Sequence, residues 1–254
     1  MNKKGAAALF KAVLWGICIL LFPILSGVLS ALLALGTIET LFLQGIFMLL
    51  SLILPLIFVM AKKWRWGEIG FAKTDINGCK KAMYFLPLLT VLIPVAVKGF
   101  YARSAAYVLG NLFLYLSVGI AEEVYFRGIV PKYLNRVFSF KGVIFLSAVI
   151  FGIGHIASAF TASNGSEVLL SVLNAFIFGW LAIEMALICK NIMPGILLHF
   201  MFDFETKIVV MDGNDLLAAE CIRGTVMVLA AVWLGIILVK LKKTGERGFI
   251  CRRL

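Results

Sequence analysis

Two adjacent glutamates and an arginine, Glu122, Glu123 and Arg127, lie in the apolar stretch GIAEEVYFRGIV at residues 119–130. If this stretch is helical, Glu123 and Arg127 are four residues apart and share a face, in the favourable order of acid before base. Glu122 points about 100° away around the helix axis. The arginine can therefore neutralise and orient Glu123 and leave Glu122 facing elsewhere. An unpaired carboxylate in a low-dielectric site holds a proton readily, which suits a general base.

The two histidines of the chain complete the set of residues that could do chemistry. His155 ends FGIGH at 151–155, and His199 begins HFMFD at 199–203. Phe151 precedes His155 by four residues, so its ring can pack beside the imidazole. Asp203 shares a helix face with His199, where it can accept an imidazole N–H and set the tautomer, or act as a ligand itself. Histidine titrates near neutrality and is the commonest metal ligand, so both side chains are candidates for catalysis or metal binding.

Structural interpretations compete with these functional ones. Glu123 and Arg127 could form a plain salt bridge with Glu122 as a bystander, and a single buried histidine is usually a satisfied core residue. Asp203 could pair with Lys207, which is also four residues away. Against this, a charged side chain at the centre of a membrane helix costs at least about 2.5 kcal/mol. We therefore interpret the group as a functional site inside a bundle.

Two further acids occur in apolar segments. Glu184 lies about a turn and a half before Lys190, and we expect its carboxylate to reach the membrane interface. Glu205 stands close to Lys207, which indicates a water-exposed helix face. The motifs H-E-x-x-H and G-x-S-x-G are absent, so neither a zinc protease of that type nor a serine hydrolase is indicated.

The solvent that surrounds these residues follows from composition. The 254-residue chain is 62% hydrophobic and 15% charged, with a mean hydropathy of +1.04. A soluble domain has about a quarter charged residues, so this is an integral membrane protein. The apolar runs are continuous and long enough to cross a bilayer as helices. We predict an all-α, polytopic bundle of about eight spans, near 8–34, 40–61, 82–98, 104–122, 142–160, 167–189, 191–210 and 222–240. The fourth span can continue past residue 122, because the sequence stays largely apolar to Pro131.

The charge of +11 indicates topology rather than a nucleic-acid partner. With eight spans and the N-terminus inside, 20 of the 24 Lys and Arg residues fall on one side. This is the positive-inside bias, and it predicts that both termini are cytoplasmic. The five cysteines have no C-x-x-C spacing, so neither a disulfide framework nor a zinc knuckle is indicated.

The chain reads as a single membrane domain, 1–254, without repeats. Residues 1–61 hold two spans, 62–81 form a basic cytoplasmic loop with Trp64 and Trp66 at interface positions, and 241–254 form a basic cytoplasmic tail. The first run is longer than a signal-peptide core and is expected to stay as an anchor. Short loops and the lack of targeting extensions favour a bacterial plasma membrane.

The three motifs, in this order, resemble those of the type 2 CAAX prenyl protease and bacteriocin-processing family, also called CPBP or Abi. The family pattern is E-E-x-x-x-R, F-x-x-x-H and H-x-x-x followed by Asn or Asp. Here these read Glu122 to Arg127, Phe151 to His155, and His199 to Asp203. The likeness covers roughly 103–205, which would be the catalytic core, and WGEIGF at 66–71 is similar to a segment such proteins carry upstream.

The resemblance implies an intramembrane endopeptidase whose site opens toward the cytoplasm and whose substrate is a peptide or membrane-associated protein. Glu122 would activate the attacking water, Glu123 would assist it, and Arg127 would hold the glutamates. His155 would contact the water or the substrate carbonyl, and His199 with Asp203 would stabilise the oxyanion.

The need for a metal is left open. Either a glutamate acts on water directly, or Glu122, His155, His199 and Asp203 bind a divalent metal such as zinc. An ionised aspartate cannot donate a hydrogen bond to an oxyanion as asparagine can. We favour a metal-independent mechanism in which Asp203 positions His199. Two alternative functions are a non-catalytic immunity or partner-binding protein of the same fold and, less favoured because no inverted repeat is visible, a small proton-coupled transporter. The sequence leaves the oligomeric state and the substrate open.

Overall fold

The structure is a computed structural model that describes residues 3–83, 92–93, 99–100, 103–160, 164–209 and 213–243. Across these residues it is all-α, with two isolated β-bridges and no sheet. Six helices are long and apolar enough to cross a membrane, which confirms the polytopic helical bundle. The elements in chain order are α1 (Lys3–Leu32), α2 (Thr37–Ser51), α3 (Ile53–Ala61), the 3₁₀-helix η1 (Trp66–Ile69), α4 (Ile76–Met83), α6 (Ala105–Glu123), the π-helix η2 (Val124–Ile129), α7 (Val130–Leu134), α8 (Phe140–Gly154), the 3₁₀-helix η3 (His155–Phe160), α9 (Gly165–Cys189), α10 (Met193–Ile208) and α11 (Gly213–Lys243).

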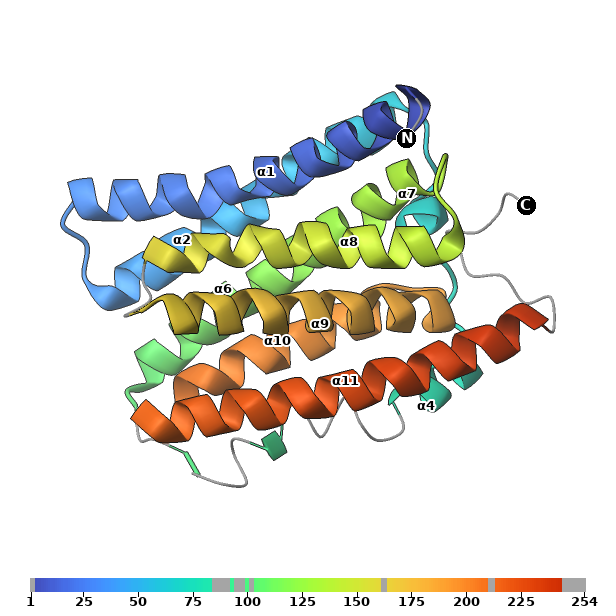
Figure 1. Cartoon of the computed structure of the whole chain (residues 1–254). Helices are drawn as coiled ribbons and strands as arrows, with labels where there is room; N and C mark the ends of the chain where they lie inside the picture. Colours follow the sequence, from blue (N-terminus) through green and yellow to red (C-terminus); the bar gives the residue numbers. More distant parts are fainter. Residues whose placement is uncertain are drawn as a thin grey trace.

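These helices account for seven of the eight expected spans. The third, 82–98, lies mostly outside the described residues. Helix α10, at 16 residues, is shorter than the six candidate membrane spans, which have 18 to 30 residues each. The start of α1 and the ends of α7, α9 and α11 lie at the same end of the bundle (Figure 1). Most of the basic residues are therefore at that end; its cytoplasmic orientation stays a prediction.

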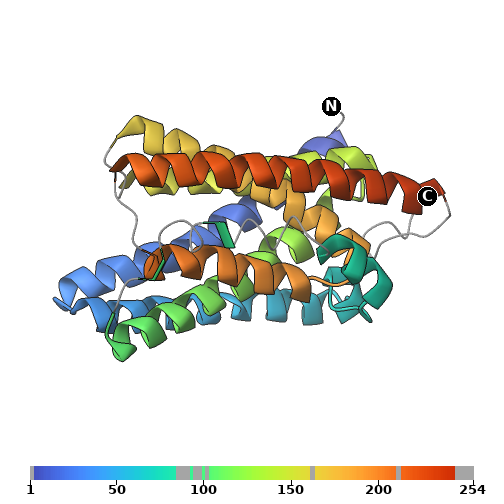
Figure 2. The ribbon, with the colours of Figure 1, turned by 90° about the horizontal axis from the view of Figure 1, so that it is seen from below.

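The bundle has two layers around the candidate site (Figure 2). Helix α9 packs between α8 and α11 in one layer, and α6 packs between α2 and α10 in the other. Helix α1 crosses from α2 to α8 and α7. Helix α9 is the most buried of the membrane-length helices, with 72% of its apolar window inside the protein. It is thus the central helix of the bundle.

Helix α6 continues past residue 122, as expected, but the continuation is a π-helix. Six buried residues, Val124–Ile129, form η2, and the Val130 N–H bonds back five residues to the Tyr125 carbonyl. A π-segment inserts one extra residue per turn and is frequent at functional sites. Gly128 on η2 has the Ile69 carbonyl 2.8 Å from where a Cβ would lie, so a larger residue would push η1 away from this segment.

Tyr125 on η2 anchors α6 to the break between α2 and α3. Pro55 has no N–H, so the Ser51 carbonyl lacks the helical donor that it would otherwise receive. The Tyr125 hydroxyl donates to this carbonyl at 2.8 Å. The break and the π-helix are therefore joined by a bond that satisfies a buried backbone acceptor.

The basic loop after α3 is folded onto the end of the bundle. Glu68 pairs with Lys132 at 2.8 Å, and Asp75 pairs with Lys190 at 3.0 Å. The Gly78 amide and Lys190 hold the pKa of Asp75 below its usual value. A hydrogen bond from Lys132 does the same for the pKa of Glu68. This loop is an ordered cover for the ends of α7 and α9.

Candidate active site

Glu123 is the centre of the candidate site. Its side chain is 0% exposed, and its Oε1 lies 2.9 Å from Arg127 Nη1 and 2.9 Å from His199 Nδ1. The i,i+4 pair with Arg127 is the one that the sequence predicts. The bond to His199 connects α6 to α10. Because a carboxylate only accepts hydrogen bonds, Nδ1 carries a proton and donates a hydrogen bond to Glu123.

Two glycines let α6 and α10 approach closely enough for this bond. A Cβ on Gly119 would lie 3.1 Å from the Ile196 carbonyl oxygen, and one on Gly195 would lie 3.0 Å from Glu123 Oε2. Both distances are tighter than ordinary side-chain contacts. Larger residues at either position would separate His199 from Glu123 or displace the carboxylate.

Aromatic rings enclose the Arg127 guanidinium, which is 1% exposed. It lies 4.3 Å from the centroid of Phe151 and 5.4 Å from that of Phe178. The His199 ring packs on Phe178 at 4.8 Å between centroids. Cation–π attraction strengthens in such water-poor surroundings. The aromatic enclosure therefore fixes the arginine and the imidazole together with Glu123.

Glu122 faces a different environment from its neighbour. Its side chain is 18% exposed and its Oε2 lies 3.7 Å from His199 Nε2. That oxygen is buried and makes no hydrogen bond. Glu122 also lines a cavity of about 170 Å³ together with Leu20, Phe126, Phe151, Gly154, His155 and Ala157. The unpaired carboxylate thus borders a space large enough for water molecules.

His155 borders the same cavity from the end of α8. It begins the 3₁₀-helix η3, and its Nδ1 lies 3.0 Å from the Phe151 carbonyl oxygen. Its ring packs on Phe151 at 4.7 Å between centroids, as the four-residue spacing predicts. Since Nδ1 donates to the carbonyl, Nε2 is the nitrogen available to a ligand in the cavity.

Asp203 extends the group along α10. Its Oδ2 lies 3.5 Å from His199 Nε2, and its side chain is 26% exposed. Lys207, the alternative partner, has its Nζ 5.7 Å from the Tyr115 ring centroid instead. The His199 Nε2 is therefore flanked by two carboxylates, Glu122 and Asp203.

The proposed metal ligands do not converge. Among the described residues, no group of three or more His, Cys, Asp or Glu side chains is arranged to hold a metal ion. His199 donates from Nδ1 to Glu123 and faces two carboxylates with Nε2. Since the described residues hold no group of ligands arranged for a metal ion, no step of the chemistry below passes through one. The candidate site places an unpaired carboxylate, that of Glu122, beside two imidazoles and a buried cation.

Sequence reasoning missed a second buried charge group, next to the candidate site. Arg223 on α11 is 1% exposed and pairs with Glu205 at 3.2 Å and Glu220 at 2.7 Å. It also donates to the Phe202 carbonyl at 2.9 Å, beside Asp203. The inference of a wet face at Glu205 is wrong, because α11 covers that side of α10. The available signal was an arginine inside the last expected span, 222–240.

The interfacial position expected for Glu184 is also wrong. Glu184 is 4% exposed and accepts a hydrogen bond from Trp180 Nε1 at 3.0 Å. It faces α11 rather than Lys190, whose Nζ is bonded to Asp75. Helix packing, which a single span does not reveal, buries this carboxyl group.

Comparison with known proteins gives one family. Residues 104–204 match the family model for type II CAAX prenyl endopeptidases, Rce1-like. The match spans about two-fifths of the chain, from the start of α6 into α10, and contains all six candidate residues. It confirms the resemblance to the CPBP and CAAX protease family. No curated protein and no solved structure matches the chain significantly.

Proposed function

We propose that this membrane protein, whose residues 104–204 belong to the Rce1-like type II CAAX prenyl endopeptidase family, is an intramembrane endopeptidase that uses Glu122 to activate water. The observation that carries the proposal is the contrast between the two adjacent glutamates. Glu123 is tied to Arg127 and His199 at 2.9 Å, whereas Glu122 comes no closer than 3.7 Å to His199 and lines a cavity with His155. The first arrangement holds a site together, and the second leaves a base available.

Glu122 acts as the general base. A water molecule in the cavity donates one proton to the carboxylate as its oxygen attacks the carbonyl carbon of the scissile peptide bond. The resulting tetrahedral species collapses when the C–N bond breaks, and Glu122 returns the proton to the leaving amine. Positioned proton transfer of this kind contributes about 10² to 10⁴ in rate.

The two histidines stabilise the charge that forms on the carbonyl oxygen. His199 in its doubly protonated form donates from Nε2, with Asp203 and Glu122 as the flanking carboxylates at 3.5 and 3.7 Å. His155 presents Nε2 to the same cavity, because its Nδ1 is committed to the Phe151 carbonyl. Donors that are fixed before the reaction need no reorganisation in the transition state, which is the main source of this kind of stabilisation.

Glu123 and Arg127 are positioning residues. Glu123 sets the proton of His199 on Nδ1, and Arg127 balances the buried charge of Glu123. The aromatic enclosure prevents water from competing with these bonds. Asp203 orients His199 from the opposite side of the ring. This division of roles does not require a metal ion.

The substrate is a peptide or a membrane-associated protein. The site is built from membrane helices, so a peptide bond must come to it at or below the membrane surface. In the topology predicted from the positive-inside bias, Glu122 lies about three turns from the cytoplasmic end of the α6–α7 helix. Entry from the cytoplasmic side is therefore the route that the proposal favours.

Comparative peptidomics of cells that carry the wild-type protein or Glu122→Gln tests the proposal. Membrane levels are matched, and Glu39→Gln, at an exposed glutamate in the first turn of α2, serves as a control for loss of a carboxylate. We expect specific new N-termini with the wild type and the control and none with Glu122→Gln. Identical profiles for all three, together with a phenotype that needs the protein, would refute catalysis by Glu122 and favour a partner-binding role.

A further inference from the structure

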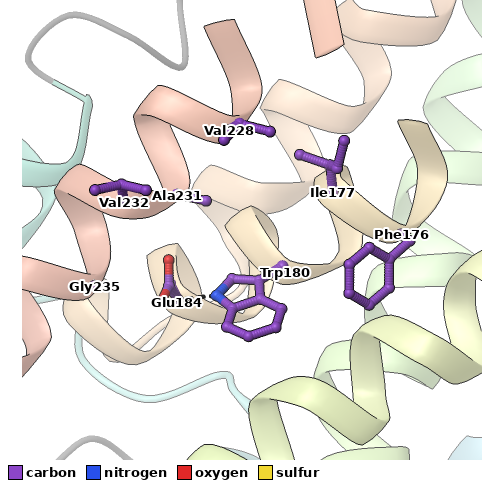
Figure 3. Close-up of a pocket in the computed structure, with 8 residues that line it drawn as sticks. All are labelled: Phe176, Ile177, Trp180, Glu184, Val228, Ala231, Val232 and Gly235. Atoms are coloured by element: carbon purple, nitrogen blue, oxygen red, sulfur yellow. Dashed lines mark hydrogen bonds between the residues drawn. The ribbon is translucent and has the colours of Figure 1, made fainter. Parts of the chain in front are cut away.

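A second cavity lies on the other side of α9 from the candidate active site. It has a volume of about 330 Å³ and is lined by Phe176, Ile177, Trp180, Glu184, Val228, Ala231, Val232 and Gly235. The first four come from α9 and the rest from α11. Figure 3 shows Glu184 and Trp180 side by side on α9, with Val228 and Val232 on the neighbouring helix α11. This volume is within the usual range of small-molecule sites.

Glu184 carries the sole ionisable side chain among these lining residues. It is 4% exposed. Its Oε1 accepts the Trp180 N–H at 3.0 Å, and its Oε2 is buried with no hydrogen-bond partner. A buried carboxyl oxygen without a partner is costly, and the cost is removed when a donor binds. The cavity therefore combines apolar walls with one unsatisfied acceptor.

The position of Gly235 shows that the carboxyl group fits closely against α11. A Cβ at residue 235 would lie 3.2 Å from Glu184 Oε1, so the glycine leaves room for the carboxyl group beside the helix. The hydrocarbon rim of the cavity is open: Val228 is 44% exposed and Val232 is 58% exposed. In a membrane that rim faces lipid chains, so a ligand would enter sideways from the bilayer.

We propose that this cavity binds a single-chain amphiphile whose head is a primary amine, with the amine on Glu184 and the chain along Ile177 and Val228. An amine supplies the hydrogen-bond donor that Oε2 lacks, and its positive charge complements the carboxylate. Charge-assisted bonds of this kind are about twice as strong as neutral ones. The hydrocarbon chain of the ligand exchanges contacts with lipid for contacts with the cavity walls. The site is separate from the candidate active site, because Phe178, which packs on His199, is on the other face of α9.

Trp180 provides the reporter for a test. The purified full-length protein in nanodiscs is titrated with a twelve-carbon primary amine that carries bromine on its fourth carbon, close to the amine, since bromine quenches a tryptophan that it contacts and Trp180 lies beside Glu184. A brominated methyl ester of the same length is the control ligand without a donor. We expect saturable quenching by the amine only. Trp180→Phe should remove that quenching and leave the fluorescence of the other tryptophans unchanged.

Variants identify the groups that bind. Glu184→Gln should weaken binding of the amine at least tenfold, and Val232→Phe should block it by filling the rim. Leu229→Phe adds the same ring at an exposed α11 residue that does not line the cavity, and it should bind like wild type. Thermal unfolding and gel filtration show that each variant is folded.

Three results would overturn the proposal. Equal quenching by amine and ester would mean that lipid chains fill the cavity without recognition. Unchanged amine binding in folded Glu184→Gln would exclude the carboxyl group as the binding group. An absence of quenching, with a doubled particle mass that Val232→Phe returns to the monomer value, would mean that a second copy of the chain covers the cavity.

Discussion

His199 Nδ1 and Glu123 Oε1 lie 2.9 Å apart, and they come from helices that are 76 residues apart in the sequence. This bond joins α6 to α10 inside the membrane-spanning bundle. It also distinguishes two carboxylates that are neighbours in the sequence: Glu123 is committed to holding the site together, and Glu122 is not.

Replacement of the two glutamates should therefore separate stability from activity. Glu123→Gln removes a buried charge that balances Arg127, so we expect the free energy of unfolding to fall by about 3 to 5 kcal/mol. Glu122→Gln removes a carboxylate whose Oε2 makes no hydrogen bond, so we expect a change of less than about 1 kcal/mol. Both variants should lose hydrolysis. Denaturant unfolding followed by circular dichroism, in a mild detergent, measures the difference. Equal destabilisation by the two would contradict the assigned roles.

The histidines should affect the reaction rate more than substrate binding. His155→Phe keeps an aromatic ring on Phe151 but loses the nitrogen that faces the cavity, and we expect kcat to fall about 10² to 10³-fold with little change in KM. Ile156→Ala, at the exposed neighbouring residue, is the matched control and should leave kcat unchanged. The measurement is steady-state cleavage of a peptide identified by the peptidomic comparison. A change confined to KM would show that His155 binds substrate and does not stabilise the transition state.

Local patterns predicted one part of this site and could not predict the other. The pairs Glu123–Arg127 and Phe151–His155 follow from helical spacing, and the structure has both. The bond from His199 to Glu123 depends on how α6 and α10 pack, which no local pattern encodes. The same reason explains the errors at Glu184 and Glu205, since α11 covers both. The π-helix after Glu123 also had no signal in the sequence, because its residues read as an ordinary apolar helix.

Chelation should not affect hydrolysis. Among the described residues, no three potential ligands are arranged to hold a metal ion. We therefore expect cleavage to be unchanged after treatment with 1,10-phenanthroline and dialysis. Elemental analysis of the same sample reports whether a metal was present at the start. Loss of cleavage that returns on addition of zinc alone would contradict the metal-independent mechanism.

Acid should loosen the loop that covers the end of α9. The Gly78 amide and Lys190 hold the pKa of Asp75 below its ordinary value. A lowered folded-state pKa adds stability above the unfolded-state pKa, about 3.9, and this stability is lost as the pH falls through the folded-state pKa. We expect amide exchange in α4, measured by mass spectrometry and corrected for the intrinsic effect of pH, to rise below that range. In Asp75→Asn the protection should already be lower at neutral pH and should lack this acid-dependent step. Equal protection in the two proteins at neutral pH would show that the pair does not hold the loop.

Arg223 should be the residue of α11 on which the position of α10 depends most. Its guanidinium group pairs with Glu205, donates to the Phe202 carbonyl and lies 3.7 Å from the Phe202 ring centroid. Arg223→Leu leaves Glu205 as an uncompensated buried charge, so we expect a loss of about 3 to 5 kcal/mol in the free energy of unfolding.

The double variant Arg223→Leu with Glu205→Leu tests whether that loss comes from the stranded charge. Replacement of a whole buried pair by apolar residues is often neutral, so the double variant should be more stable than Arg223→Leu alone. It should still cleave more slowly than wild type, because the Phe202 carbonyl beside Asp203 has lost its donor. A double variant less stable than either single variant would mean that Arg223 stabilises the bundle through its bonds to Phe202 and Glu220 rather than by balancing Glu205.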